Sequence, residues 1–172
     1  MTTWQVRLAC VTCAAAGIAL IAQQRTPPTP AQGIANNLRS VNRRLLDMAK
    51  DFPEDKYDFR PTPQVRSFGE VILHAMAGNT YAVKVAHGVS GANWDKEEVD
   101  PKAYHGKAEV VAAFQKSVEE ANDAVSKIEP AQFTKTLAPW LSVIEHSGEH
   151  YGQLVVYYRL NGLVPPESRP KK

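Results

Sequence analysis

Two histidines four residues apart, His146 and His150, are the residues of this sequence best suited to chemistry. The segment around them has the apolar spacing of a helix, and residues i and i+4 of a helix lie on one face, one turn apart. Two imidazoles in this arrangement can bind one metal ion, and zinc, nickel and iron(II) all accept such ligands. The same spacing also occurs in pairs of polar histidines at a surface or at the edge of a core. A metal site therefore requires a third ligand elsewhere in the chain.

A third histidine, His74, lies on the apolar face of another predicted helix. Val71, Gly78, Tyr81 and Val85 share that face at helical spacing. A histidine in such a position is either a hydrogen-bonded core residue or a ligand that meets the histidine pair.

The long polar connection 87–106 contains the two remaining histidines, His87 and His105, together with Trp94. Long loops in compact domains are often functional. Single loop histidines are usually solvated, so neither is predicted to be a ligand, whereas Trp94 is predicted to fold back over the helices. Gly148 is a weak helix former between His146 and His150, and it favours close packing of another element at that point.

Four segments with helical periodicity must position these residues. Apolar residues recur at spacings of three and four through 34–51, 62–86, 107–128 and 139–161. No segment shows the alternation of a strand. The sequence therefore predicts an all-α fold, a four-helix bundle.

Several residues predict where these helices begin and end. Thr62 and Pro63 predict the N-cap and first residue of the second helix. Pro139 predicts the start of the fourth helix, after a turn at 129–136. Asn161–Gly162 predicts its end.

The first 22 residues have the pattern of a secretory signal peptide. Arg7 supplies a positive charge, Leu8 to Ile21 is apolar or small, and cleavage is expected after Ala22. The alternative is a permanent membrane anchor, but this apolar stretch is short for a hydrocarbon core of about 30 Å. The sequence thus predicts an exported protein, in the periplasm or outside the cell.

The rest of the chain divides into a proline-rich linker at 23–32, a bundle at 33–168 and a basic tail at 169–172 that we expect to be disordered. Both cysteines, Cys10 and Cys13, precede the predicted cleavage site, so the mature chain has no disulfide and no thiolate ligand. The formal net charge of +2 gives no electrostatic footprint of a nucleic-acid-binding protein.

Three motifs together resemble the DinB-like family. They are the stretch from Thr62 to His74, the stretch from His146 to Leu154, and the closing segment from Tyr158 to Pro166. The resemblance covers residues 34–168 and implies a four-helix bundle with an up-down-down-up arrangement, often dimeric. Members typically bind a divalent metal through one histidine of the second helix and two of the fourth, which implies His74, His146 and His150 as the ligands here.

The resemblance also limits the functions to be considered. Better-understood relatives include thiol-dependent transferases and isomerases, while many members have no assigned activity. Three histidine ligands leave at least one coordination position for water or substrate, as in catalytic zinc sites. We therefore expect a metal-dependent transferase or hydrolase acting on a small molecule, with zinc as the first choice of metal and nickel or iron as alternatives.

A non-catalytic exported bundle that binds a metal or another ligand is the second hypothesis. Export disfavours thiol chemistry, because reduced thiols are scarce outside the cytoplasm. Glu149 lies on another face of its helix and is not expected to act as a base, whereas Glu145, Glu70 and Tyr157 are candidates to orient the ligand rings. The predicted partners are a small molecule and a possible second copy of the chain, with no nucleic acid.

Overall fold

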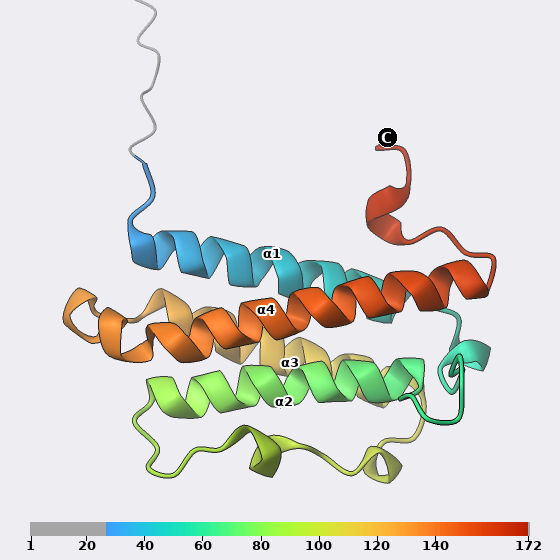
Figure 1. Ribbon diagram of the computed structural model, residues 1–172, viewed down its shortest axis with the longest axis horizontal. Coiled ribbons are helices and arrows are strands. Elements are labelled where there is room, and N and C mark those ends of the chain that lie inside the picture. Colours follow the sequence, from blue (N-terminus) through green and yellow to red (C-terminus); the bar gives the residue numbers. More distant parts are fainter. Residues whose placement is uncertain (1–26, 172) are drawn as a thin grey trace, which may run out of the picture.

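The structure, a computed structural model, describes residues 27–171, and within that range its regular elements are all helical. Its four long helices are α1 (Pro30–Asp51), α2 (Phe68–Ala86), α3 (Lys107–Ser126) and α4 (Pro130–Leu160). In Figure 1, α1 and α4 run in one direction and α2 and α3 in the other, with the connection 87–106 returning along the length of the bundle. The prediction of an all-α bundle with up-down-down-up order is therefore confirmed.

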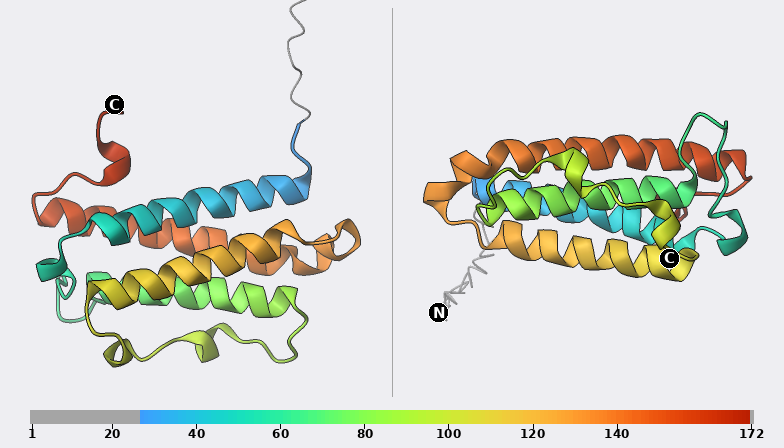
Figure 2. Two further views of the ribbon diagram at one scale, coloured as in Figure 1. Left: turned by 180° about the vertical axis from the view of Figure 1, so that it is seen from behind. Right: turned by 90° about the horizontal axis from the view of Figure 1, so that it is seen from below.

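Each helix packs mainly against two others. The extensive contacts join α1 to α3 and α4, and α2 to α3 and α4. Helices α1 and α2 therefore face each other across the diagonal of the bundle, with α3 and α4 between them (Figures 1 and 2).

Helix α1 buries the apolar stripe that the sequence predicts. Leu38, Val41, Leu45 and Met48 are all buried. The helix begins at Pro30 rather than near residue 34, because Thr29 accepts a hydrogen bond from the Gln32 amide and Gln32 reciprocates in a capping box. The last three residues of the predicted linker are therefore helical.

The start of α2 differs from the prediction. Thr62 and Pro63 lie in a turn, and the helix begins at Phe68 with Ser67 as its N-cap. The Ser67 hydroxyl accepts from the Glu70 amide at 3.3 Å, and the Glu70 carboxylate accepts from the Ser67 amide at 2.7 Å. This capping box satisfies two free N–H groups, whereas threonine before proline satisfies at most one. The predicted start at Thr62 was wrong.

The start of α4 also differs. The helix begins at Pro130, after Glu129 as its N-cap, and includes the rest of the predicted turn at 129–136, so Pro139 lies in its interior. Proline at the first helical position is favourable at either site, and an interior proline lacks an N–H and costs one helical hydrogen bond. The helix continues through Pro139 for 31 residues in all.

The apolar core consists of two clusters along the bundle axis. The larger cluster lies toward the end where α1 ends and α2 begins, and it includes Phe52, Phe68 and Tyr158. The smaller cluster lies toward the other end and includes Leu38 and Trp140. The Tyr158 hydroxyl of the larger cluster donates to the Met48 carbonyl at 3.0 Å, which joins α4 to the end of α1.

The C-terminal segment is attached to the bundle at Arg169. Its guanidinium donates to both oxygens of Asp51, at 2.8 and 2.5 Å, which holds this residue of the predicted tail against the end of α1. The predicted signal peptide at 1–22 lies outside the described residues. None of the helices in residues 27–171 is long and apolar enough to cross a membrane.

Candidate metal centre

The three histidines predicted as ligands lie together on α2 and α4. His74 Nε2 lies 3.0 Å from His146 Nε2, which lies 2.9 Å from His150 Nε2. All three residues offer nitrogens within 4.8 Å of one another, an arrangement that could hold a metal ion. His87 and His105, which the sequence excludes, are exposed and do not belong to this cluster.

Two structural features produce this convergence. His146 and His150 are one turn apart on α4, and their rings are 4.2 Å apart between centroids. Helix α2 packs against α4, and His74 lies on the contacting face, with ring centroids 4.7 and 4.8 Å from those of His146 and His150. The apolar stripe that contains His74 thus turns this residue toward the pair.

The spacing of the nitrogens suits a shared ion. Zinc binds imidazole nitrogen at about 2.0–2.1 Å, so two nitrogens on one ion are roughly 2.9–3.4 Å apart for bond angles between the octahedral and tetrahedral values. The two distances at His146 Nε2 are 3.0 and 2.9 Å. One ring nitrogen carries either one proton or one lone pair, so it cannot make a full hydrogen bond to each neighbour. A cation between the three nitrogens satisfies them all.

Hydrogen bonds at the far nitrogens direct the lone pairs of two rings toward this point. The Glu98 carboxylate, which can only accept, contacts His74 Nδ1. The Gln153 carbonyl oxygen lies 2.8 Å from His150 Nδ1. In both rings the proton is therefore on Nδ1 and the lone pair on Nε2, which is the tautomer that binds a metal ion through Nε2.

The His150 partner is itself held by further hydrogen bonds. Gln153 donates from Nε2 to the Tyr157 hydroxyl at 3.0 Å, and that hydroxyl donates to the Arg66 carbonyl at 2.7 Å. This chain joins α4 to the residue preceding the N-cap of α2. The orientation of the His150 ring is thus fixed by both helices that carry ligands.

Of the three residues predicted to orient the ligand rings, only Tyr157 helps to orient one, and it does so indirectly. Tyr157 acts through Gln153, whereas Glu70 caps α2 and pairs with Arg60 at 2.9 Å. Glu145 is exposed. The direct partners, Glu98 and Gln153, were missed, although Gln153 is three residues after His150 and so one turn away on the same face.

The electrostatic environment favours the neutral form of the His146 and His150 rings. Burial lowers the pKa of His146 to about 3, and the charges of His150, His74 and Arg66 add to this effect. Burial also lowers the pKa of His150, against the opposing hydrogen bond to Gln153. Neutral imidazole is the form that binds metal, so burial prepares both residues for ligation.

The connection between α2 and α3 packs on the remaining side of the centre. Trp94 lies over Gly78 of α2, and its ring meets the His146 ring at 68° with centroids 4.6 Å apart. His146 Nδ1 is buried and has no hydrogen-bond partner within the described range, so packing rather than a hydrogen bond orients this ring. The predicted folding of Trp94 over the helices is confirmed.

The contact between Trp94 and α2 requires a glycine at position 78, whereas no contact requires the glycine at position 148. A Cβ atom at Gly78 would lie 2.5 Å from the Trp94 ring, whereas nothing lies within 4 Å of a Cβ at Gly148. The close packing predicted at Gly148 is therefore absent, and Gly78 has that role instead.

Alanine substitutions should separate the two glycines. Gly78→Ala is expected to lower the free energy of unfolding by about 1–3 kcal/mol, because Trp94 must leave its position or α2 must shift. Gly148→Ala, the matched control, is expected to raise it by up to about 1 kcal/mol, because alanine favours an exposed helix. Urea denaturation followed by circular dichroism measures both. Equal stability of Gly78→Ala and the unsubstituted protein would show that the Trp94 contact has no energetic importance.

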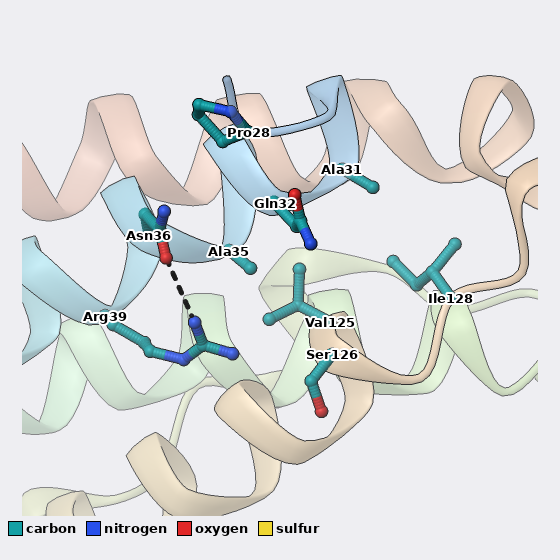
Figure 3. Close-up of a pocket in the computed structure, with 9 residues that line it drawn as sticks. All are labelled: Pro28, Ala31, Gln32, Ala35, Asn36, Arg39, Val125, Ser126 and Ile128. Atoms are coloured by element: carbon teal, nitrogen blue, oxygen red, sulfur yellow. Dashed lines mark hydrogen bonds between the residues drawn. The ribbon is translucent and has the colours of Figure 1, made fainter. Parts of the chain in front are cut away.

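The protein has a surface opening that lies away from the histidines. It has a volume of about 470 Å³ and lies between the start of α1 and the end of α3. Figure 3 shows that polar side chains contribute to its lining, including Gln32, Ser126 and Arg39, whose guanidinium donates to Asn36 at 3.2 Å. No histidine lines this pocket, so the metal-binding chemistry described above does not extend to it.

The fold and the site together place this protein in the class of helical bundles with a candidate metal centre. Its second helix carries one histidine of that centre, and its fourth helix carries two. The sequence profile of the DinB superfamily matches residues 37–154, which include all three histidines, and the chain belongs to this superfamily. A search among curated proteins finds no match.

Proposed function

We propose that the protein binds one divalent metal ion through His74, His146 and His150 and uses it as an enzyme on a small molecule. The observation that carries the proposal is the convergence of the three Nε2 atoms, 3.0 and 2.9 Å apart across His146. Zinc is the proposed metal, since it accepts three imidazoles, with nickel and iron(II) as alternatives.

The proposed reaction is a transfer or a hydrolysis. Three protein ligands leave a coordination position for water or substrate, where a bound metal can lower the pKa of water and polarise a carbonyl. The residues of the chain hold the ligands in place: Glu98 and Gln153 orient two rings, and Trp94 packs against the third.

A non-catalytic metal- or ligand-binding protein is the second candidate, and one observation favours it. The carboxylate and the hydroxyl associated with the centre are already engaged. Glu98 contacts the far nitrogen of His74, and the Tyr157 hydroxyl donates to the Arg66 carbonyl. A hydrolase needs a group that can move a proton at the open coordination position, whereas a protein that only binds a metal or ligand needs no such group.

Two measurements on the purified protein test these proposals. After dialysis against a chelator, calorimetric titration with zinc is expected to show one equivalent bound, and no binding would overturn both candidates. Metabolite extracts are then incubated with zinc-loaded protein and with His146→Ala. Conversion of a small molecule into a new product only with the loaded protein supports the enzyme. A molecule that the loaded protein retains and releases unchanged on denaturation supports the binding role.

We also propose that the protein is exported after removal of residues 1–22, and that the mature chain can form a homodimer. The apolar stretch from Leu8 to Ile21 supports export. Intact-mass measurement on protein from the native host is expected to give a chain that begins at Gln23. A soluble cytoplasmic chain that still carries Met1 would rule export out, and sedimentation analysis of the mature chain decides between monomer and dimer.

A further inference from the structure

A layer of buried polar side chains crosses the bundle between its two apolar clusters. Each helix contributes one residue: Asn42 from α1, Asn79 from α2, Ser117 from α3 and Ser147 from α4, all 0–5% exposed. In α1, α2 and α4 this residue separates the members of the larger cluster from those of the smaller one. In α3, Ser117 directly precedes Val118, the last residue that this helix contributes to the larger cluster. The apolar core is therefore interrupted by polar side chains near the boundary of its two clusters.

Asn79 is the centre of this layer. Its Oδ1 accepts from Asn42 Nδ2 at 3.1 Å, and its Nδ2 donates to the Ser117 hydroxyl at 3.3 Å. The Ser117 hydroxyl donates in turn to the Phe114 carbonyl at 2.8 Å. Because α1 and α2 are diagonal neighbours, the bond between the two asparagines passes through the middle of the bundle. One side chain thus links α2 to both α1 and α3.

The layer is a poor way to gain stability. Within residues 27–171, Asn42 Oδ1 and the Ser147 hydroxyl are buried without a hydrogen-bond partner, which carries a desolvation cost. Apolar side chains of similar size at these positions avoid that cost. Buried polar groups have a better-attested role in fixing how helices are aligned, because their hydrogen bonds form in one register only.

The buried polar residues of α2 and α4 lie within about two helical turns of the histidines along their own helices. Ser147 directly follows His146, and Asn79 is five residues after His74, about 7.5 Å along the helix. A shift of α2 along its axis by one residue moves His74 by about 1.5 Å. That shift is half of the 3.0 Å distance between His74 and His146, so the metal centre depends on the register of α2.

We propose that Asn79 is a positioning residue of the metal centre, which fixes the register of α2 through Asn42 and Ser117 so that His74 meets His146 and His150. The proposal rests on the proposed metal binding. It assigns a role to a side chain whose hydrogen bonds go to Asn42 and Ser117 and not to the three histidines.

Asn79→Leu tests the proposal. The variant is expected to keep or raise its melting temperature, since leucine buries no polar group, and to bind zinc about tenfold more weakly, the lower end of the effect of residues that orient ligands. Calorimetric titration and thermal melting measure the two quantities separately. A folded variant that binds zinc as tightly as the unsubstituted protein would overturn the proposal.

A second pair of variants guards against misfolding caused by the larger leucine. Asn42→Ala removes the diagonal hydrogen bond, and Val41→Ala, at an equally buried neighbouring position of α1, removes only apolar contacts. Both should lower the melting temperature, and only Asn42→Ala should weaken zinc binding. An equal loss of affinity in the two variants would show that packing, and not the hydrogen bond, positions the ligands.

Crystal structures of the metal-free variants give a readout independent of metal binding. The proposal expects His74 Nε2 and His146 Nε2 to lie beyond 3.5 Å in Asn79→Leu, compared with the present 3.0 Å. An unchanged distance overturns it. If the unsubstituted protein binds no zinc, the proposed function fails, and this distance still decides whether Asn79 sets the register.

Discussion

Replacement of His146 by alanine is expected to weaken zinc binding by at least about 100-fold. Loss of a residue that only orients a ligand costs about 10–100-fold in affinity, and loss of a ligand should cost no less. His146 is also the central member of the cluster, since its Nε2 lies within 3.0 Å of both other Nε2 atoms. Titration of the chelator-treated variant with zinc measures the effect.

His87→Ala is the matched control for this substitution. His87 is exposed at the end of α2 and lies outside the cluster, so its removal should leave zinc affinity within about twofold of the original. Circular dichroism establishes that both variants are folded. Equal affinities of His146→Ala and His87→Ala would exclude His146 as a ligand.

Metal removal is expected to lower the melting temperature clearly at pH 8 and only slightly at pH 5. Zinc stabilises the fold by mass action, by about 2.7 kcal/mol when free metal is a hundred times its dissociation constant. Ligation requires neutral imidazoles, so protons compete with zinc as the pH falls. The large buried clusters of the core should keep the chain folded without metal, so all four melting transitions should be cooperative.

The metal-free protein should also lose stability in acid. The pKa of His146 in the folded state, about 3, lies below the value of about 6.5 for free imidazole, and the pKa of His150 is lowered as well. The unfolded chain therefore takes up protons first. This part of the stability is fully present above pH 6.5 and is lost as the pH falls toward the folded-state pKa.

Thermal melting with and without chelator, at pH 8 and at pH 5, tests both statements. An unfolded chelated sample at pH 8 would mean that the metal is structural, and the case for an open catalytic position would lose its main support. No difference at either pH, in protein shown beforehand to contain metal, would exclude the three histidines as its ligands.

The features that sequence predicts well here are those that depend on nearby residues. The stripe from Leu38 to Met48 gives the buried face of α1, since helical geometry alone determines which residues share a face. The same geometry pairs His146 with His150. The role of His74 did not follow from its own segment, where a core histidine fits equally well, and it required the family resemblance.

The features that could not be predicted from the sequence depend on competition between two possible helix starts, or on contacts between residues far apart in the chain. Thr62–Pro63 and Ser67 both have the pattern of a helix start, and the reciprocal bonds of Ser67 with Glu70 favour the second. Glu98 reaches His74 from a connection whose path no local pattern specifies. The bond from Asn42 to Asn79 joins residues 37 positions apart, so neither segment alone indicates it.

The central claim is that one metal ion binds at the three Nε2 atoms, and a crystal structure of the zinc-loaded protein with anomalous scattering measured at the zinc edge tests it most directly. The predicted result is one anomalous peak about 2.0–2.2 Å from Nε2 of His74, His146 and His150. It should have at least one further position filled by water or another small ligand. A peak bound instead to His87 or His105, or no peak at the cluster in crystals grown with excess zinc, would contradict the claim.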